Sequence, residues 1–314
     1  DFSNVDLISW LDSIGVSTFI GSSNRVFPKP LKANELLNTW LEILKSYKNF
    51  SLFTKHELTN IEKDHVEFNN SIKVGFDKVV YAFGGSSWSR TGSDGSWVKL
   101  FEKFKIDIKE FKPMNVGFNI DWSENLKKLF DRTYLKNITL KINHKKVRGE
   151  LMVTPYGMEG TPIYSLSLEI RTCLEKSNDV YIYLDLKPDL NQAEINLKFK
   201  NRKSKDSLSN FLRKTLSLDK LSLALLKEFT PKDEYNSSIE SLIKNCPIKI
   251  SSARSIEEAI STSGGISMGE VDSNFMLNKL ENHYAIGEML DWDTITGGYL
   301  LQGCFSMAYR VSSI

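Results

Sequence analysis

The chain has 314 residues, 41% of them hydrophobic, and its 41 Lys and Arg against 39 Asp and Glu give a formal net charge of +2 at pH 7. The length suits about two domains, and the near-neutral charge excludes an acidic tail and a chain-wide electrostatic attraction to nucleic acid. The three Cys and four His are scattered, and they form neither a disulfide framework nor a metal-ligand spacing. No apolar run approaches the roughly 20 residues that span a bilayer. We therefore expect a cytoplasmic protein without a metal site or a membrane span.

The first part of the chain has the pattern of an α/β domain. Residues 4–15 show helical spacing of apolar side chains and end at Gly15, and residues 32–47 predict a stronger amphipathic helix. Short strands are predicted at 50–61, 65–69 and 71–76. The apolar run VVYAF (79–83) then predicts a buried parallel strand.

The spacing of apolar residues changes twice along the chain before the α/β pattern returns. Residues 111–186 alternate as strands do, residues 190–229 have the leucine spacing of helices, and strands return from Ile256. This order predicts one sheet domain into which a second module is inserted. The predicted boundaries are 1–110 and 251–314 for the two parts of the sheet domain, 111–188 for a β-rich insertion and 189–250 for a helical subdomain.

The run LKFKNRKSKDSLSNFLRK (197–214) contains seven Lys or Arg. Such a run suits a surface for nucleic acid or anionic lipid, or else the solvated face of a helical subdomain. Leu and Phe recur between the charges, and the chain as a whole is nearly neutral. We therefore favour the solvated face and expect no nucleic-acid partner.

Two glycine pairs follow strand-like runs. Gly84-Gly85 ends the run 79–83 and is followed by TGSDG just before another predicted helix, where exposed backbone N–H groups suit an anionic or carbonyl-rich ligand. Gly264-Gly265, in STSGGISMGEV (261–271), has a similar approach. Either pair alone is as well explained by a simple turn.

A third turn lies near the end of the chain, in NHYAIGEMLDWDTITGGYLLQ. A short strand is broken by Gly287, which presents Glu288 at the carboxyl end of the strand, where open α/β sheets bind ligands. Glu288 or Asp291 could accept hydrogen bonds from sugar-like hydroxyls. Gly297 and Gly298 then open an apolar helix that we expect to be buried. We predict that the three turns converge on one cleft at the carboxyl edge of one sheet.

These segments resemble one known family. YAIGEMLDWDTITGGYLLQ closely resembles the carboxyl-terminal flavin motif of the BaiN-like (YhiN-type) NAD(P)/FAD-dependent oxidoreductases, and YAFGG resembles the strand and turn of flavoproteins with two dinucleotide-binding lobes. Three further segments are similar to that family: TSGGISMGEVDSNFM, TPYGMEGTPIYSLS (154–167) and GSSNRVFPK (21–29). The resemblance covers nearly the whole chain, and the closing motif is its most specific part.

The sequence also departs from the family pattern. The family opens with a strand, a GxGxxG turn and an acidic residue for the adenosine ribose, none of which is present in this sequence. Phe83 stands where the family usually has Thr, and Asn24 where it usually has Gly. Because the later flavin motifs are intact, we expect a missing amino-terminal βαβ unit in preference to a lost cofactor.

The resemblance implies an α/β fold with a Rossmann-like FAD-binding domain, incomplete at its amino terminus, that carries the two insertions. Glu288 would bind the ribityl or pyrophosphate-side hydroxyls, and Gly297 and Gly298 would admit the pyrimidine edge of the flavin. The helix start would stabilise charge at N1 and O2 by about 0.3–1 kcal/mol. The implied cofactor-binding residues are Gly84, Gly85, Gly264, Gly265, Gly287, Glu288, Asp291, Gly297, Gly298, Tyr299 and Leu300.

The implied activity is hydride transfer through flavin N5, with NAD(P)H as candidate reductant and an unknown small molecule as substrate. The polar candidates for catalysis on the implied cleft loops are Arg90, Tyr156 and Tyr299, each of which could equally be structural. Two alternatives stay open: a flavin-linked RNA-modifying protein that holds RNA with the basic helical segment, and a non-catalytic remnant without cofactor. The motifs indicate nothing about oligomeric state.

Overall fold

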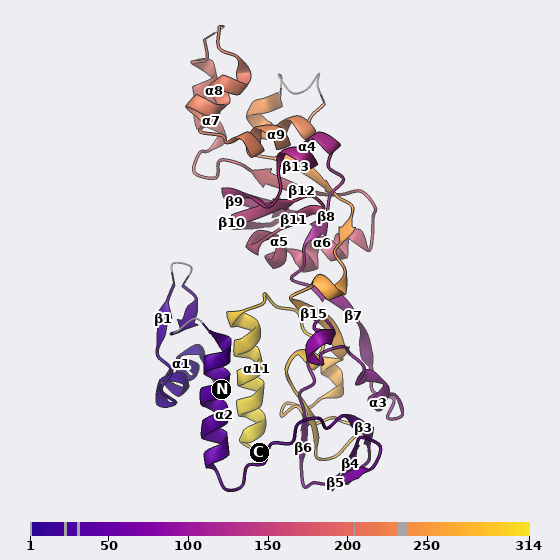
Figure 1. Cartoon of the computed structure of the whole chain (residues 1–314). Coiled ribbons are helices and arrows are strands. Elements are labelled where there is room, and N and C mark those ends of the chain that lie inside the picture. Colours follow the sequence, from indigo (N-terminus) through magenta and orange to yellow (C-terminus); the bar gives the residue numbers. More distant parts are fainter. Residues whose placement is uncertain (1, 22–23, 30–31, 204, 232–237) are drawn as a thin grey trace. The chain divides into compact units, whose positions relative to one another are not determined.

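The computed structural model describes residues 2–21, 24–29, 32–203, 205–231 and 238–314 (Figure 1). The chain forms two compact units: Asp1–Lys112 with Ser263–Ile314, and Pro113–Thr262. The second unit is therefore inserted into the first. The segment predicted as a separate helical subdomain, 189–250, lies within the second unit. Residues 22–23 of the motif GSSNRVFPK lie outside the described residues.

Helices of the first unit begin and end where local signals place them. Ser3 caps the first helix, because its Oγ accepts from the Asp6 N–H at 3.3 Å while its own N–H donates to Asp6 Oδ2 at 2.7 Å. The helices predicted at 4–15 and 32–47 are confirmed. In the described part of this unit the helical elements are α1 (Asn4–Ser13), α2 (Ala33–Ser46), α3 (Val98–Glu102) and α11 (Gly298–Ser312), with short 3-10 turns η1 (Ser89–Thr91), η3 (Met268–Glu270) and η4 (Gly287–Met289).

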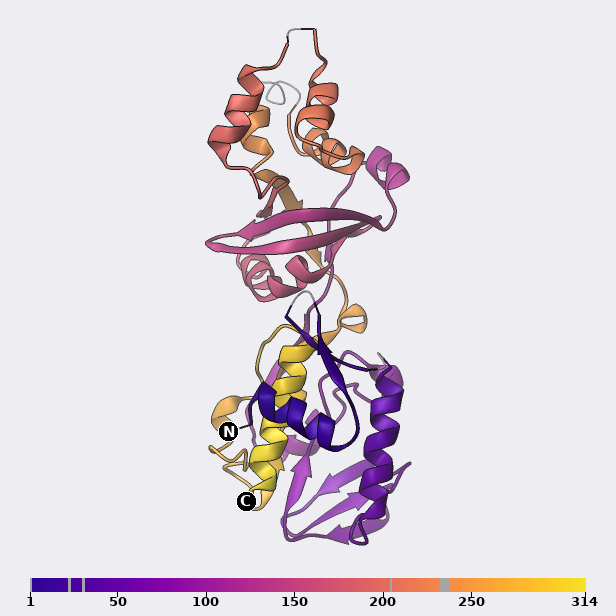
Figure 2. The ribbon, with the colours of Figure 1, turned by 90° about the vertical axis from the view of Figure 1, so that its left-hand side faces the viewer.

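Helix α11 lies beside α1 (Figures 1 and 2), and aromatic side chains join both helices to α2. Trp10 of α1 lies 5.5 Å from the ring of Phe305 and 5.2 Å from that of Trp40. Nevertheless no residue of α11 is buried, and Leu301 is 56% exposed. The prediction that the last helix is buried was therefore wrong: its apolar side chains are spread around the helix, and the neighbouring helices cover only part of its circumference.

The strands of the first unit form several small sheets. A three-stranded antiparallel sheet has the order β3-β4-β5, β1 pairs with β2, and β6 pairs in parallel with β16. Strands β7 and β15 pair with each other where the chain passes between the units. Of the strand predicted at 50–61 only β3 forms. The bounds are β1 (Thr18–Ile20), β2 (Val26–Pro28), β3 (Leu58–Ile61), β4 (His65–Phe68), β5 (Ile72–Gly75), β6 (Val79–Tyr81), β7 (Ile108–Met114), β15 (Ser261–Ile266) and β16 (His283–Ala285).

A buried hydrogen bond joins the parallel strands β6 and β16. The Tyr81 hydroxyl lies 2.8 Å from His283 Nδ1, and His283 Nε2 lies 3.3 Å from the Lys63 carbonyl oxygen. A neutral imidazole with its proton on Nε2 satisfies both contacts, since Nδ1 then accepts from the tyrosine and Nε2 donates to the carbonyl. Burial lowers the pKa of His283 and raises the pKa of Tyr81.

The stability of the first unit is therefore expected to depend on pH through His283. Because the folded-state pKa lies below the unfolded value of about 6.5, the unfolded chain takes up the proton first on acidification. The free energy of unfolding should be steady above about pH 6.5 and fall as the pH drops below it. Urea unfolding of the wild type and of His283→Gln across this range measures the effect. The His283→Gln variant should lose that part of the pH dependence, whereas His144→Gln, at an exposed position, should keep it. If the free energy of unfolding changed with pH equally in the wild type and in His283→Gln, His283 would not be its cause.

The second unit is built on one seven-stranded antiparallel sheet. Its strand order is β13-β12-β9-β10-β11-β8-β14. The strands are β8 (Phe118–Asn119), β9 (Thr133–Ile142), β10 (Lys145–Thr154), β11 (Gly157–Glu159), β12 (Val180–Asp185), β13 (Cys246–Ile250) and β14 (Ser252–Ala253). Its described helical elements are α4 (Glu124–Leu129), α5 (Thr161–Ser165), α6 (Ser167–Leu174), α7 (Gln192–Lys200), α8 (Leu208–Thr215), α9 (Lys220–Glu228) and η2 (Ile256–Glu258).

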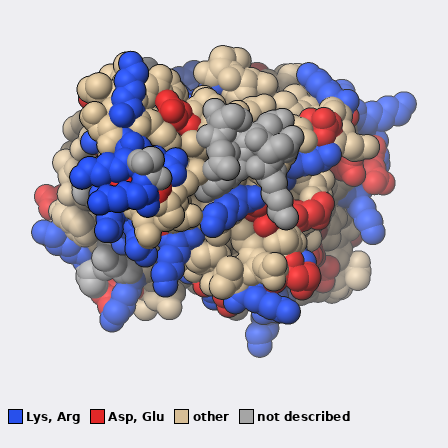
Figure 3. All heavy atoms as spheres, turned by 90° about the horizontal axis from the view of Figure 1, so that it is seen from above, with Lys and Arg blue, Asp and Glu red and all other residues tan. Residues whose placement is uncertain are grey.

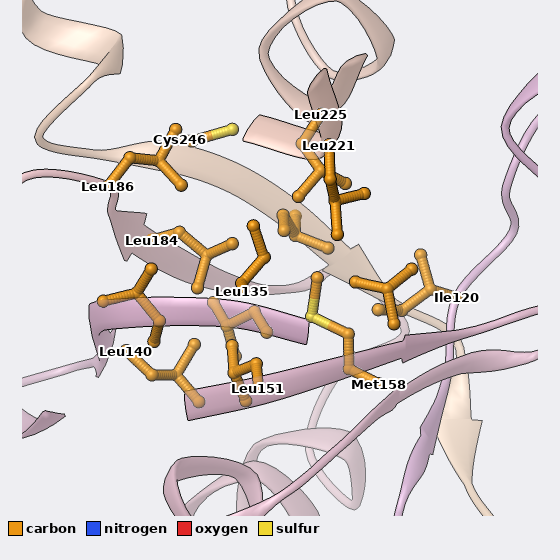
Figure 4. Close-up of a cluster of buried hydrophobic side chains, with 14 of the residues drawn as sticks. Ile120, Leu135, Leu140, Leu151, Met158, Leu184, Leu186, Leu221, Leu225 and Cys246 are labelled. Atoms are coloured by element: carbon orange, nitrogen blue, oxygen red, sulfur yellow. The ribbon is translucent and has the colours of Figure 1, made fainter. Parts of the chain in front are cut away.

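Helices cover both faces of this sheet. Figure 2 shows α5 and α6 on one side and α7 to α9 on the other. Leu221 and Leu225 of α9 point to Leu135 and Leu184 of the sheet in one buried cluster (Figure 4). Because the helical and β-rich segments share this core, they form one unit. None of the described helices is long and apolar enough to cross a membrane.

Candidate cofactor site

Two of the predicted turns leave the same edge of the parallel pair β6–β16. The strands run side by side, and each is followed by a glycine with positive φ, Gly84 at +76° and Gly287 at +77°. An indole fixes each turn: Trp97 Nε1 donates to the Gly84 carbonyl at 3.1 Å, and Trp292 Nε1 donates to the Gly287 carbonyl at 2.9 Å. The first and third predicted turns therefore lie at one carboxyl edge, where α/β folds bind ligands.

The loop after Gly84 folds back on itself. A Cβ at Gly84 would lie 2.9 Å from Ser93 Oγ, and that hydroxyl donates to the Gly85 carbonyl at 3.1 Å. Gly85 is buried, whereas Gly84 is partly exposed. Arg90, a candidate for catalysis, lies in η1 of this loop and is exposed. Of the two glycines, Gly84 is thus the one that solvent reaches.

The third turn packs against the last helix. The Gly287 N–H donates to Met307 Sδ at 3.2 Å, and a Cβ at Gly287 would lie 3.7 Å from Cys304 Sγ. Burial, together with the nearby charge of Glu288, raises the pKa of the Cys304 thiol. Glu288 is itself half-buried in η4. The carboxylate predicted to meet the cofactor is therefore held beside α11.

The glycine pair Gly264-Gly265 lies inside strand β15 and not in a turn that follows a strand, which corrects the prediction for this segment. Both residues have positive φ, and a Cβ would lie 2.3 Å from the Glu110 carbonyl oxygen at Gly264 and 2.3 Å from the Met289 carbonyl oxygen at Gly265. The Gly264 N–H also donates to Asp291 Oδ1 at 3.2 Å. The pair thus lies beside the third turn, and its glycines allow the chain segments to approach closely.

Gly265→Ala is expected to destabilise the first unit by about 1–3 kcal/mol or more, because the added methyl group meets backbone and the φ of +109° is strained for alanine. Thermal unfolding measures the loss. Gly269→Ala is the matched control in the same unit, since no atom lies within 4 Å of its Cβ and its φ is ordinary. A Gly265→Ala protein of wild-type stability that has lost only a ligand would contradict this role.

The start of α11 is open. Gly297, with φ +86°, occupies the N-cap without a side-chain cap, and within the described part of the chain a Cβ built at Gly297 or Gly298 meets no atom of another segment within 4 Å. Tyr299 is 66% exposed and Leu300 is half-buried. The first N–H groups of a helix have no acceptor within it, and they favour electron-rich atoms. This uncapped helix start, with open space beside it and Glu288 on the preceding turn, fits the electron-rich edge of a flat ligand such as a flavin.

A hollow along the later turns of α11 does not include this site. It is lined by Phe2, Ser273, Phe275, Gly303, Ser306, Met307, Tyr309, Arg310 and Ser313. None of the predicted cofactor residues lines it, and its charged side chain, Arg310, donates from Nε to Asn274 Oδ1 at 3.0 Å. We therefore place the candidate cofactor site at the start of α11. Within the described residues no group of three or more His, Cys, Asp or Glu could hold a metal ion.

The second unit carries its own polar cluster. The Arg254 guanidinium lies 4.1 Å from the ring centre of Tyr156, and its Nη1 donates to Asn119 Oδ1 at 3.1 Å. Tyr164, which sequence patterns did not single out, donates its hydroxyl to Glu159 Oε2 at 3.3 Å. Burial and the charge of Glu159 raise the pKa of Tyr164 to about 12, so the phenol is a weaker acid than an exposed tyrosine and stays protonated at neutral pH.

One family model matches the whole chain, and two known proteins resemble most of it. The family model described as HI0933-like protein Rossmann domain matches residues 1–314. The chain is 25% identical over 247 residues to 3-dehydro-bile acid delta(4,6)-reductase of Clostridium scindens, which covers 74% of this chain and 60% of that protein. It is 24% identical over 270 residues to ribosomal RNA dihydrouridine synthase of Escherichia coli, which covers 83% of this chain and 67% of that protein. The chain thus spans about two thirds or less of the length of these relatives.

Proposed function

The chain belongs to the HI0933-like Rossmann family, and from this premise we propose that the protein is an FAD-dependent oxidoreductase. The membership confirms the family resemblance and the α/β, Rossmann-type fold class predicted from the motifs. The observation that most supports the activity is the open start of α11, which has no side-chain cap and follows the turn that carries Glu288. The name of the Clostridium scindens relative, a reductase, supports a reduction.

Bound FAD would supply hydride transfer. The residues of this chain would bind and orient it: Glu288 would accept hydrogen bonds from hydroxyl groups, and the N–H groups of Tyr299 and Leu300 would donate to the electron-rich edge of the ring. The helix start would add about 0.3–1 kcal/mol of charge stabilisation, and more where water is excluded. Gly297 and Gly298 would leave room for the ring, because neither carries a Cβ.

We further propose NAD(P)H as the reductant and an activated C=C bond of a small molecule as the group that is reduced. Such a reduction delivers a hydride to one carbon and a proton to the other. The candidates for the proton donor are Tyr156, Arg90 and Tyr299.

A second candidate function is the reduction of a base in RNA. Two observations favour it: the Escherichia coli relative is named a ribosomal RNA dihydrouridine synthase, and residues 197–214 of this chain hold seven Lys or Arg. The same flavin site would serve both candidates. They differ in what the second unit must recognise.

The test begins with protein expressed from the complete gene. We expect it to be yellow, with FAD released on denaturation and identified by chromatography. Anaerobic bleaching by NADH or NADPH then measures the reductant, and reoxidation by a conjugated enone or by RNA separates the two candidates. Colourless protein that takes up no added FAD would refute both.

A further inference from the structure

The charge of the chain is divided unevenly between its two units. Residues 113–262 hold 24 Lys and Arg against 19 Asp and Glu, whereas the remaining residues hold 17 against 20. The small overall charge of +2 is therefore the sum of a basic second unit, with net charge +5, and an acidic first unit, with net charge −3. Overall neutrality is consequently no argument against a polyanionic partner of the second unit.

The excess positive charge gathers on α7, α8 and the turn between them, which we call the basic face. Seen from above, Figure 3 shows Lys and Arg crowded on the left, where Figure 1 places these two helices. Apart from half-buried Lys198, the described cations of the basic face are exposed, and the acidic residues of the same elements are Glu194, in the first turn of α7, and half-buried Asp206. The cations are Lys198, Lys200, Arg202, Lys203, Lys205, Arg213 and Lys214.

No carboxylate in the described part of the chain forms an ion pair with these seven side chains. Arg202 donates from Nη2 to the carbonyl oxygen of Asp206 at 2.9 Å, and Arg213 donates to Asn210 Oδ1 at 3.1 Å. Elsewhere in the unit cations do have acidic partners, as in the pair Lys249–Asp179. Like charges at this density repel one another, so an anion that neutralises them would bind favourably.

Most apolar side chains of the two helices are already used for packing, although Leu197 of α7 is exposed. Ile195, Phe211 and Leu212 are buried in the core, and Phe199 lies 4.9 Å from Phe211 in an edge-to-face contact. The two helices therefore have no free apolar face of the kind that inserts into a membrane surface. Both aromatic residues of the segment pack against each other, so the face offers phosphate contacts and not base stacking.

We propose that the basic face binds structured RNA through its phosphate groups. The choice of RNA over DNA rests on the second candidate function given above, whereas the phosphate contacts rest on the charges alone. Duplex RNA suits such a face, because proteins recognise it mostly by its shape and its backbone. The second unit would thus hold the polymer independently of the cofactor.

Fluorescence anisotropy with a labelled RNA hairpin, at a series of salt concentrations, tests this surface on protein from the complete gene. The test variant combines Arg202→Gln, Lys203→Gln and Lys205→Gln. The control variant combines Lys45→Gln, Lys48→Gln and Lys99→Gln, three exposed lysines of the first unit, and changes the charge equally. We expect the test variant to bind about 10-fold or more weakly at low salt and to reduce the steepness of the log–log salt plot by about 2–3, since each phosphate contact contributes roughly 0.7–0.9.

Equal losses in the two variants would overturn the assignment to this face. An equally tight DNA duplex would overturn the choice of RNA, and binding to phosphatidylserine vesicles without binding to RNA would identify a membrane surface instead. The assay needs no flavin. Yellow, reducible protein that does not bind RNA would therefore refute this inference and the RNA candidate but leave the FAD-dependent activity standing, whereas colourless protein that binds RNA as expected would refute only the flavin function.

Discussion

Gly298→Val is expected to lower the flavin content of the purified protein by about 10-fold or more while the fold survives. Among the described residues, no atom outside the neighbouring helix backbone lies within 4 Å of a Cβ at this position, and Gly298 has an ordinary φ. The position therefore has room for a Cβ, and the backbone conformation does not require glycine. The isopropyl group would instead fill the open space beside the helix start, which is where the proposed ring must lie.

Flavin absorbance per protein and thermal unfolding, measured together, check this prediction. Gly269→Val is the matched control, because a Cβ there also meets open space but lies outside the proposed site. Glu288→Gln should be milder than Gly298→Val, since the amide oxygen still accepts a hydrogen bond and only the charge is lost. Full flavin content in Gly298→Val would show that the start of α11 does not touch the cofactor.

Features with local causes could be predicted from the sequence. The helix α2 follows from its apolar spacing, and the turn after β16 follows from Gly287, whose φ of +77° suits glycine. The start of α11 follows from the pair Gly297-Gly298. Each of these depends on neighbours within one or two turns of chain, which a single sequence displays directly.

Features that depend on contacts with distant parts of the chain could not be predicted from the sequence. The glycines of β15 are required by the carbonyl groups of Glu110 and Met289, and Gly264 lies far from Glu110 in the sequence. A glycine pair occurs both in turns and where two strands approach closely, so the sequence pattern alone could not distinguish the two. We predicted the turn, and the structure shows the close approach. The bond between Tyr81 and His283 likewise joins residues 202 positions apart.

Burial was the least predictable property. An apolar run such as that of α11 is buried only if other elements cover it, and the covering elements are set by the tertiary fold. Helix α9 is buried, in contrast, because Leu221 and Leu225 pack against the sheet of the second unit. That contact joins the predicted β-rich and helical segments in one core, and no local pattern marks the two as partners.

Asp185→Ala is expected to destabilise the second unit by about 3–5 kcal/mol, the largest loss of stability that we predict. Asp185 is 6% exposed at the end of β12, and its Oδ2 lies 2.7 Å from Lys244 Nζ and 3.8 Å from Lys141 Nζ. Its Oδ1 accepts from the Lys187 N–H at 3.0 Å. Removing the carboxylate leaves Lys244 with a charge that is largely shielded from water, and only the carbonyl groups of Lys187 and Leu190 remain to receive its protons.

Urea unfolding, followed by hydrogen exchange of the β9 and β12 amides, measures the loss in the second unit separately from the first. Asp189→Ala is the control in the same unit: Asp189 pairs with Arg148, both side chains are more than half exposed, and such a pair is worth about 0–1 kcal/mol. The double variant Asp185→Leu with Lys244→Met should recover much of the loss, because it removes both buried charges together. If Asp185→Ala cost no more than Asp189→Ala, solvent would reach Lys244 in the folded protein, and the ion pair would not be a buried anchor of the sheet.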